Sequence, residues 1–251
     1  MTETVLITGA SSGFGLAFVK HYSSLPSPPS IIALDNQSFP ESQLPSLNPK
    51  TVRFFQVDIT SPNLLSDLAQ QIGPGPIHLI LHCAGVRGLV KSIVQSKPGD
   101  VAAAETLAVM DKETMTKTFE INTWGTFNLI KTFLPNIQDA VRSEQGGAPP
   151  RVIILSSRMG SVAANVGGGG YAYRVSKAAL NAVVKSVSID VPEASFLLLH
   201  PGRVETGLVA WKEEGAISVE ESLIDCLKVI DGMKRGEGGK FLDRFGKTIE
   251  W

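Results

Sequence analysis

The sequence predicts an α/β fold, a doubly wound parallel sheet with helices on both of its faces. Short apolar runs rich in Val, Ile and Leu alternate along the chain with amphipathic helical patterns. Continuous apolar runs are typical of strands that are buried on both faces. Strands that alternate with helices pair in parallel through right-handed crossovers. No internal repeat or linker interrupts this pattern, so we expect a single domain over residues 1–251.

The strands are recognised by their short apolar runs, many of which end at a polar or glycine-rich turn. We expect strands over residues 4–7, 31–34, 52–57, 77–81, 152–155, 196–199 and 240–242. The second strand ends at Asp35 and the third at Asp58. Residues 86–105 and 143–150 are expected to form irregular loops.

Helical patterns fill most of the intervals between these strands. We expect helices over residues 13–24, 63–72, 111–134, from about 171 onward, and 219–230. Pro135 is expected to end the long third helix, because a proline in a helix interior removes a hydrogen bond and clashes with the preceding turn. Four residues of the helix near 171 have the spacing of one packed face: Val175, Ala178, Ala179 and Ala182.

Composition and charge restrict the classes of partner. The chain of 251 residues has 43% hydrophobic and 19% charged residues, which suits a globular domain with a sizeable core. Its net charge is −1 and it has no basic stripe, so we expect no nucleic-acid partner. No apolar run reaches membrane-spanning length, and residues 5–7 are too short a run for a signal peptide, so we expect no membrane partner.

The cysteines and two of the histidines are interpreted as structural residues. Cys83 and Cys226 lie in apolar segments without a CxxC spacing, which favours reduced, buried thiols in a cytoplasmic protein. His82 and His200 end different strands, and we find no third ligand beside them. We therefore expect no metal site and interpret both as histidines with satisfied hydrogen bonds.

A glycine-rich turn joins the first strand to the first helix. It contains Thr8, Gly9, Ser11, Ser12, Gly13, Phe14 and Gly15. Glycines at such a turn let a pyrophosphate approach the backbone at the positive end of the helix. Asp35 lies twenty residues after Gly15, at a strand end where a carboxylate can accept hydrogen bonds from an adenosine ribose. The sequence therefore predicts a dinucleotide site.

Tyr173 and Lys177 are four residues apart, so on a helix they share one face. An ammonium beside a phenol favours the phenolate, lowers the pKa of the tyrosine and suits a general acid or base. Ser157, at the end of a strand, can hold a substrate oxygen between its hydroxyl and that phenol. The same pair alone also fits a half-buried tyrosine beside a solvated lysine, so the interpretation depends on the rest of the chain.

Two neighbouring residues are alternatives for these roles. Tyr171 has no lysine four residues on, and the Ser-x-x-Gly spacing that ends at Gly160 favours Ser157 over Ser156. Residues after the sixth strand are candidates for a substrate loop, because ligands of open α/β sheets bind there. These candidates are Arg203, Glu205, Val209 and Trp211.

Together these features resemble the short-chain dehydrogenase/reductase family over nearly the whole chain. The pattern Thr-Gly-x-x-x-Gly-x-Gly is matched at residues 8–15, and the family's catalytic Ser, Tyr and Lys are matched at Ser157, Tyr173 and Lys177. Asn122 matches the family's active-site asparagine, which supports a proton-relay water. The segments Ser-Ser-Arg-Met-Gly-Ser and Tyr-Ala-Tyr-Arg-Val-Ser-Lys are most similar to the carbonyl-reductase branch that includes C-factor and sniffer. The resemblance implies a Rossmann-type fold.

The resemblance also implies which residues bind the cofactor beyond the glycine loop and Asp35. They are Asp58, Ile59, Cys83, Ala84, Gly85, Tyr173, Lys177, Pro201, Gly202, Val204 and Thr206. Two departures stand out. Residues 82–85 read His-Cys-Ala-Gly where the family has Asn-Asn-Ala-Gly, which is expected to loosen contacts behind the cofactor. Ser157 lies sixteen residues before Tyr173, more than is common, so residues 167–170 resemble an insertion that reshapes the pocket wall.

These residues predict an NAD(P)-dependent oxidoreductase that transfers a hydride between a nicotinamide cofactor and a carbonyl or secondary alcohol of a small organic substrate. In reduction Tyr173 donates the proton and Ser157 hydrogen-bonds the same oxygen. Lys177 holds the nicotinamide ribose, and Asn122 with a water returns the proton. The alternative is a cofactor-binding protein with a regulatory or non-redox tailoring role; the intact set of four residues favours the enzyme. The resemblance implies a homodimer or homotetramer through the two long helices.

Asp35 favours NAD(H) over NADP(H), although NADP(H) stays possible. A carboxylate accepts hydrogen bonds from a 2′-hydroxyl but repels a 2′-phosphate. Ser12, Asn36 and Gln37, which could supply a cationic partner for that phosphate, are not basic. The alternative role for Asp35 is structural, as the cap of a turn.

Overall fold

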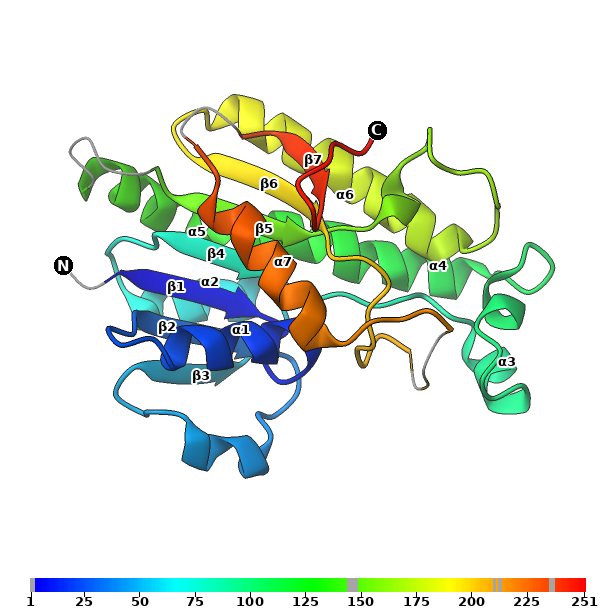
Figure 1. The fold of residues 1–251 in the computed structure, drawn as a ribbon, viewed down its shortest axis with the longest axis horizontal. Coiled ribbons are helices and arrows are strands. Elements are labelled where there is room, and N and C mark those ends of the chain that lie inside the picture. Colours follow the sequence, from blue (N-terminus) through cyan, green and yellow to red (C-terminus); the bar gives the residue numbers. More distant parts are fainter. Residues whose placement is uncertain (1–2, 144–148, 210, 212–213, 235–237) are drawn as a thin grey trace.

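A parallel sheet runs through the middle of the molecule (Figure 1). The structure is a computed structural model that describes residues 3–143, 149–209, 211, 214–234 and 238–251. Within these residues seven strands pair in the spatial order β3-β2-β1-β4-β5-β6-β7. They are β1 (Thr4–Thr8), β2 (Ser30–Asp35), β3 (Val52–Gln56), β4 (Leu79–His82), β5 (Arg151–Leu155), β6 (Ser195–His200) and β7 (Lys240–Asp243). Every ladder between neighbouring strands is parallel.

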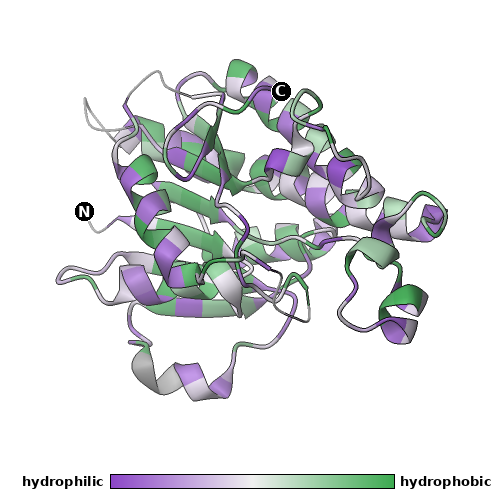
Figure 2. Ribbon diagram, turned by 45° about the vertical axis from the view of Figure 1, so that its right-hand side comes forward, coloured by the Kyte–Doolittle hydropathy of each residue, from purple (hydrophilic) through white to green (hydrophobic). Residues whose placement is uncertain are grey.

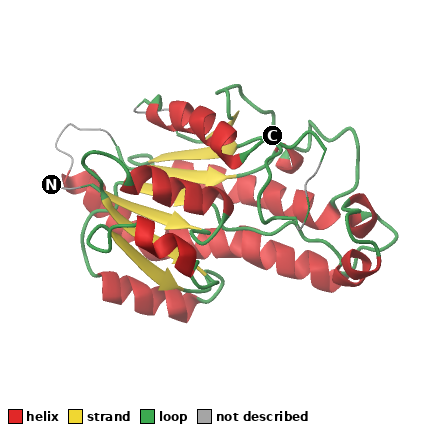
Figure 3. Cartoon of the chain, turned by 60° about the horizontal axis from the view of Figure 1, so that its bottom comes forward, coloured by secondary structure: helices red, strands yellow, loops and turns green. Residues whose placement is uncertain are grey.

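Helices cover both faces of the sheet (Figure 3). One layer holds α1 (Gly13–Ser23) and α7 (Val219–Asp231), and the other holds α2 (Pro62–Ile72), α5 (Gly125–Ser143) and α6 (Tyr171–Asp190). Alternate residues of a strand point to opposite faces, so Val5 and Ile7 of β1 enter the core with α1 and α7, whereas Leu6 enters the other core. Figure 2 shows strands that are mostly hydrophobic, as burial on both faces requires. The predicted doubly wound α/β fold is confirmed.

The order of the strands places a crevice at one edge of the sheet. β1 pairs with β2 on one side and with β4 on the other, so the chain leaves neighbouring strands in opposite directions. In open α/β sheets, ligands bind at such a switch point, outside the carboxyl ends of the strands. Thr8, Asp35 and His82 all stand at this edge, at the ends of β1, β2 and β4.

The expected stop at Pro135 is wrong. A single long rod contains α4 (Lys112–Phe119), a π-helical turn η3 (Glu120–Trp124) and α5, with Pro135 inside α5. Pro135 and Lys131, whose carbonyl loses its donor, are both exposed, so water can replace the missing hydrogen bond. Phe133 and Ile137 on the opposite side are fully buried, and this packing holds the helix together across the proline.

Residues 86–105 are more regular than expected. They contain the short helix α3 (Lys91–Ser96) and the 3₁₀ turn η2 (Ala102–Glu105), which stand out beside the sheet at the right of Figure 1. Two further 3₁₀ turns are η1 (Glu41–Ser46) and η4 (Arg158–Gly160). The loop expected at 143–150 lies mostly outside the described residues.

The expected packed face of α6 is also wrong. Val175 is 46% exposed and Ala182 is exposed, whereas the buried face carries Ala172, Tyr173, Ser176, Lys177, Leu180, Asn181 and Val184. Polar residues can take this face because each forms hydrogen bonds there, which offset the cost of their burial. Whether a second subunit covers the outer face, as the expected homodimer or homotetramer requires, stays a prediction.

Two findings concern the expected absence of a membrane partner and the expected reduced thiols. In the part of the chain that the structure describes, no helix is long and apolar enough to span a bilayer. Cys83 and Cys226 are free thiols. The cytoplasmic location stays a prediction.

Candidate active site

A cavity of about 950 Å³ lies at the carboxyl edge of the sheet, in the crevice between β1 and β4. Every residue expected to bind the cofactor lines it, from the glycine loop through Asp35 and Asp58 to Thr206. Ser157, Tyr173 and Lys177 line it as well, whereas Asn122 is completely buried and lies outside the lining. The structure therefore brings three of the four expected catalytic side chains to one cavity with the glycine loop.

Two glycines of the loop lie so close to neighbouring backbone atoms that no side chain would fit there. A Cβ on Gly15 would lie 2.1 Å from the carbonyl oxygen of Gly9. Gly9 has φ +64°, and a Cβ there would lie 3.0 Å from the Ala84 nitrogen. The side chain of Ser12 does not cap α1, which leaves first-turn N–H groups to be satisfied by something else. A cradle of this shape at a helix N-terminus fits a pyrophosphate.

Asp35 holds the glycine loop against β2. Its Oδ2 accepts hydrogen bonds from the backbone nitrogen of Ser11 at 2.9 Å and from its hydroxyl at 2.7 Å. Its Oδ1 accepts one from the backbone nitrogen of Gln37 at 2.9 Å. Asp35 therefore has the structural role in a turn that the sequence left as an alternative. The carboxylate also lines the cavity, and its oxygens have lone pairs for further donors.

A chain of hydrogen bonds runs behind the cavity through His82. The Thr126 hydroxyl donates to the backbone oxygen of Asn122 at 2.8 Å, so His82 Nε2, 2.8 Å away, must donate to Thr126 Oγ1. His82 Nδ1 then accepts from the Thr8 hydroxyl at 2.8 Å. Thr8 Oγ1 accepts in turn from the backbone nitrogens of Cys83 and Ala84, at 3.1 and 3.2 Å. Neutral imidazole satisfies every bond of this chain.

His82 therefore joins the ends of β1 and β4 to α5 behind the cofactor site. Whether the exchange at residues 82–83 loosens these contacts relative to the family stays a prediction. Burial, together with the positive charge of Lys177, lowers the pKa of His82 to about 3. Burial likewise raises the pKa of the Cys83 thiol, so both groups are neutral near pH 7. The Thr8 and Thr126 hydroxyls lie at hydrogen-bonding distance from the two ring nitrogens of His82.

His200 behaves differently from His82, and its interpretation as a satisfied histidine is wrong. Its Nδ1 is buried without a hydrogen-bond partner among the described residues. Burial, together with the positive charge of Arg158, lowers the pKa of His200 to about 4. His200 lines the cavity beside Pro201 and Gly202, where a polar group of a bound ligand could supply the missing partner.

Asn122 sits in the π-helical turn and clamps the segment after β4. Its Oδ1 accepts from the backbone nitrogen of Val86, and its Nδ2 donates to the backbone oxygen of Val86, each at 2.8 Å. Nδ2 also donates to the Ser176 hydroxyl at 3.0 Å. π-helical turns inside α-helices often mark functional sites. The side chain is thus committed to positioning, and its expected support of a proton-relay water stays a prediction.

Tyr173 and Lys177 reach the cavity from the first turns of α6. The Lys177 ammonium lies 5.7 Å from the centre of the Tyr173 ring and donates to the Leu155 backbone oxygen at 2.9 Å. Burial lowers the pKa of Lys177 to about 8. A Cβ on Gly160 would lie 2.8 Å from the Lys177 backbone, so this glycine permits the close packing of η4 on α6.

Of the two rival residues, Ser156 lines the cavity but its hydroxyl is hydrogen-bonded to α6, and Tyr171 lies outside the lining. The Ser156 hydroxyl donates to Asn181 Oδ1 at 2.7 Å inside the protein, whereas Ser157 Oγ accepts from the Met159 nitrogen at 3.2 Å at the cavity wall. Tyr171 is half-buried and is not among the residues that line the cavity. Of the substrate-loop candidates, Arg203 lines the cavity, while Glu205, Val209 and Trp211 line a separate depression against α1.

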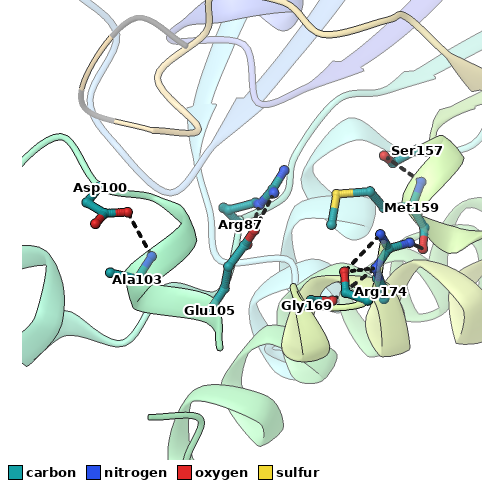
Figure 4. A network of polar contacts seen from close by, with 9 residues as sticks. Arg87, Asp100, Ala103, Glu105, Ser157, Met159, Gly169 and Arg174 are labelled. Carbon is teal, nitrogen blue, oxygen red and sulfur yellow. Dashed lines mark hydrogen bonds and ion pairs between the residues drawn. The ribbon is translucent and has the colours of Figure 1, made fainter. Parts of the chain in front are cut away.

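Several cavity residues were given no role from the sequence. Arg87, Arg158 and Arg174 all line the wall around Ser157 and Tyr173. Arg174 donates to the backbone oxygens of Gly168, Gly169 and Met159 (Figure 4), which ties the glycine-rich passage to α6. Residues 168–170 all have positive φ, a conformation that glycine adopts readily. None of residues 167–170 is among the residues that line the cavity, so the expected reshaping of the pocket wall by this passage stays a prediction.

Comparison with known proteins identifies the family. The family model of the short chain dehydrogenases matches residues 3–216. This chain belongs to the short-chain dehydrogenase/reductase family. C-signal of Myxococcus xanthus is 36% identical over 185 residues, which cover 73% of this chain and 98% of that protein.

Solved structures agree with the family. The carbonyl reductase Sniffer of D. melanogaster has 25% identity and a TM-score of 0.85, with 100% of both chains covered. An NADPH-bound carbonyl reductase from chicken fatty liver has 26% identity and a TM-score of 0.84, covering 100% of this chain and 99% of that one. Together with the glycine cradle and the cavity, membership makes this chain an NAD(P)-dependent oxidoreductase. Among the described residues, no group of three His, Cys, Asp or Glu side chains could hold a metal ion.

The neutral state of His82 makes stability depend on pH. The unfolded chain protonates His82 below its ordinary pKa of 6.5, whereas the folded chain resists protonation down to about 3. Folding stability from this group is thus complete above pH 6.5 and is lost as pH falls, by up to about 1.4 kcal/mol per pH unit. We expect His82→Gln, which keeps a donor and an acceptor, to show a shallower loss than the wild type in denaturant titrations across this range. Equal slopes in both proteins would contradict a neutral His82.

Proposed function

We propose that this enzyme transfers a hydride between NAD(H) and the carbonyl carbon of a small organic substrate, with Tyr173 as the proton donor and acceptor. One observation carries the proposal. Tyr173, only 7% exposed, lines the same cavity as the glycine cradle, together with Ser157 and Lys177. A phenol, a hydroxyl and a buried ammonium around one position are the groups that a developing alkoxide needs.

The cofactor's place follows from the residues that line the cavity. The glycine loop would hold the pyrophosphate, Asp35 the adenosine ribose, and Lys177 the nicotinamide ribose. When bound, the nicotinamide supplies the hydride, and the protein supplies position and electrostatics. His200, with its orphaned Nδ1 beside Pro201 and Gly202, would receive a polar group there.

Three side chains of the protein, Ser157, Tyr173 and Lys177, would carry out the proton transfer. Ser157 Oγ would hydrogen-bond the substrate oxygen and hold it against the Tyr173 phenol. Tyr173 would then donate its proton to that oxygen as the carbon is reduced. Lys177 favours the phenolate that remains, because its ammonium, 5.7 Å from the centre of the Tyr173 ring, stabilises a nearby anion. In the oxidative direction, the same phenolate would accept the proton of the alcohol.

The names of similar structures support a carbonyl as the substrate group. Both solved structures reported above are described as carbonyl reductases. At 25% and 26% identity they support the reaction type. The alternative, a regulatory or non-redox role, has less support because a pure sensor needs no buried phenol beside a buried ammonium.

The preference for NAD(H) is the finer part of the proposal. The chicken enzyme is described as NADPH-bound, so family membership does not select the cofactor. Asp35 supports NAD(H), because its carboxylate is fixed by Ser11 and Gln37 at the end of β2 and cannot easily turn away from a 2′-phosphate. Asn36 and Gln37, which line the cavity beside it, carry no positive charge.

Tyr173→Phe tests the proton donor. The variant should bind cofactor nearly as well as the wild type, because the ring remains, and should lose roughly a hundred- to ten-thousand-fold in turnover, the usual contribution of a general acid. Turnover is followed by the absorbance of the reduced nicotinamide with a panel of ketones and aldehydes. Tyr171→Phe is the matched control and should change turnover little. If Tyr171→Phe were the more damaging change, the assignment of the proton donor would be wrong.

Parallel titrations with NADH and NADPH test the role of Asp35. Because a 2′-phosphate near a fixed carboxylate is repelled, NADH should bind the wild type at least about tenfold more tightly than NADPH. Asp35→Asn keeps the shape of the side chain, removes the charge and should reduce this ratio. The fluorescence of the reduced cofactors reports binding directly. Tighter binding of NADPH to the wild type would overturn the preference.

A further inference from the structure

A second cation packs on the Tyr173 ring from outside the catalytic set. The guanidinium carbon of Arg87 lies 5.0 Å from the centre of that ring, closer than the Lys177 ammonium at 5.7 Å. Arg87 comes from the segment after β4, where the sequence predicts only an irregular loop. Its side chain is 14% exposed and lines the cavity. The proposed proton donor is thus in contact with two cations, Arg87 and Lys177.

The backbone around Arg87 is fixed on both sides. Asn122 holds both the nitrogen and the oxygen of Val86. Gly88 has φ +74°, and a Cβ there would lie 2.4 Å from Thr118 Oγ1 and 3.0 Å from Ala172 Cβ. Gly88 therefore lies in close contact with Thr118 of α4 and Ala172 of α6, at a position that only glycine can occupy. This contact fixes the backbone immediately after Arg87.

Glu105 fixes the guanidinium itself. Its two carboxylate oxygens accept from Arg87 Nε and a terminal nitrogen, each at 2.9 Å, in the bidentate geometry that arginine and carboxylate favour (Figure 4). Its backbone oxygen accepts from the Gly170 nitrogen at 3.0 Å, at the N-cap of α6. One residue of η2 therefore orients Arg87 and also anchors the start of the helix that carries Tyr173.

We propose that Arg87 is a positioning residue for the proton donor: locked by Glu105, its guanidinium holds the Tyr173 ring and stabilises the phenolate. The inference rests on the proposed function only in taking Tyr173 as the proton donor. A cation over the face of a phenol attracts the ring and attracts the phenolate more strongly. Glu105 offsets part of this field, so the effect is smaller than that of an unpaired cation.

Arg87 supplies a positive charge beside the Tyr173 ring at alkaline pH, where Lys177 loses its own. Burial lowers the pKa of Lys177 to about 8, so its charge declines above that pH, whereas a guanidinium stays protonated throughout. Oxidation of an alcohol needs the phenolate, which forms more readily as pH rises. The other charged side chains that line the cavity near this position are Lys117, Glu120, Arg158 and Arg174.

The phenol can be titrated directly, without substrate or cofactor. The chain has three tyrosines, and burial raises the pKa of Tyr22 to about 12. In a Tyr22→Phe, Tyr171→Phe background, tyrosinate absorbance therefore reports Tyr173 alone. Arg87→Met should raise the pKa of the Tyr173 phenol by roughly half a unit to one and a half units. Arg87→Lys, which keeps a charge but not the fork, should shift it less.

Two controls separate charge from structural damage. Arg87→Met leaves the Glu105 carboxylate without its arginine partner. The double variant Arg87→Met/Glu105→Gln removes both charges. The pKa of the Tyr173 phenol in this double variant should still exceed that in the background that contains Arg87. Arg53→Met removes a similar contact, 5.8 Å from the centre of the Phe55 ring, between two residues that do not line the cavity, and should leave the phenol pKa unchanged. The proposal is overturned if Arg87→Met causes no shift, if the double variant restores the original pKa, or if Arg53→Met shifts it equally. Loss of redox activity in Tyr173→Phe tests the proposed function separately, because this titration requires no turnover.

Discussion

The buried hydrogen bonds around His82 and Asn122 are the constraint on which the site depends. They join the end of β1, the end of β4 and the π-helical turn, three elements far apart in the sequence. Because every donor and acceptor in the chain from Thr8 to Asn122 is used, none of these elements can shift without leaving a buried polar group unsatisfied. The glycine loop on one side and the Val86 segment on the other are thereby held in fixed positions.

The rest of the site is attached to this frame. Val86, which Asn122 holds through two hydrogen bonds, directly precedes Arg87, and Arg87 contacts the Tyr173 ring. The Ser176 hydroxyl of α6 accepts a hydrogen bond from Asn122. Lys177 follows Tyr173 by one turn of the same helix. The proposed proton donor is therefore positioned by groups from β4, η3, η2 and α6 together, rather than by α6 alone. Pre-organisation of this kind lets an enzyme stabilise developing charge without reorganising itself during the reaction.

Features encoded over short distances could be predicted from the sequence. The glycine loop, the strand that ends at Asp35 and the pair Tyr173 and Lys177 each depend on a local pattern, and the structure places all of them on one cavity. Features decided by distant contacts could not. Arg87 and Glu105 are eighteen residues apart with no motif between them, Pro135 is tolerated because of what packs on the opposite side of α5, and the face of α6 is chosen by buried polar partners.

The transfer of hydride itself tests the central claim most directly. Reduced nicotinamide cofactor labelled with deuterium at C4, on the face that is transferred, is incubated with the wild-type protein and a panel of ketones and aldehydes, and the products are examined by mass spectrometry. The account predicts an alcohol that carries deuterium on the former carbonyl carbon, together with oxidised cofactor. Binding of the cofactor with no deuterium in any product, from either labelled face, would contradict it and would favour a regulatory or non-redox role.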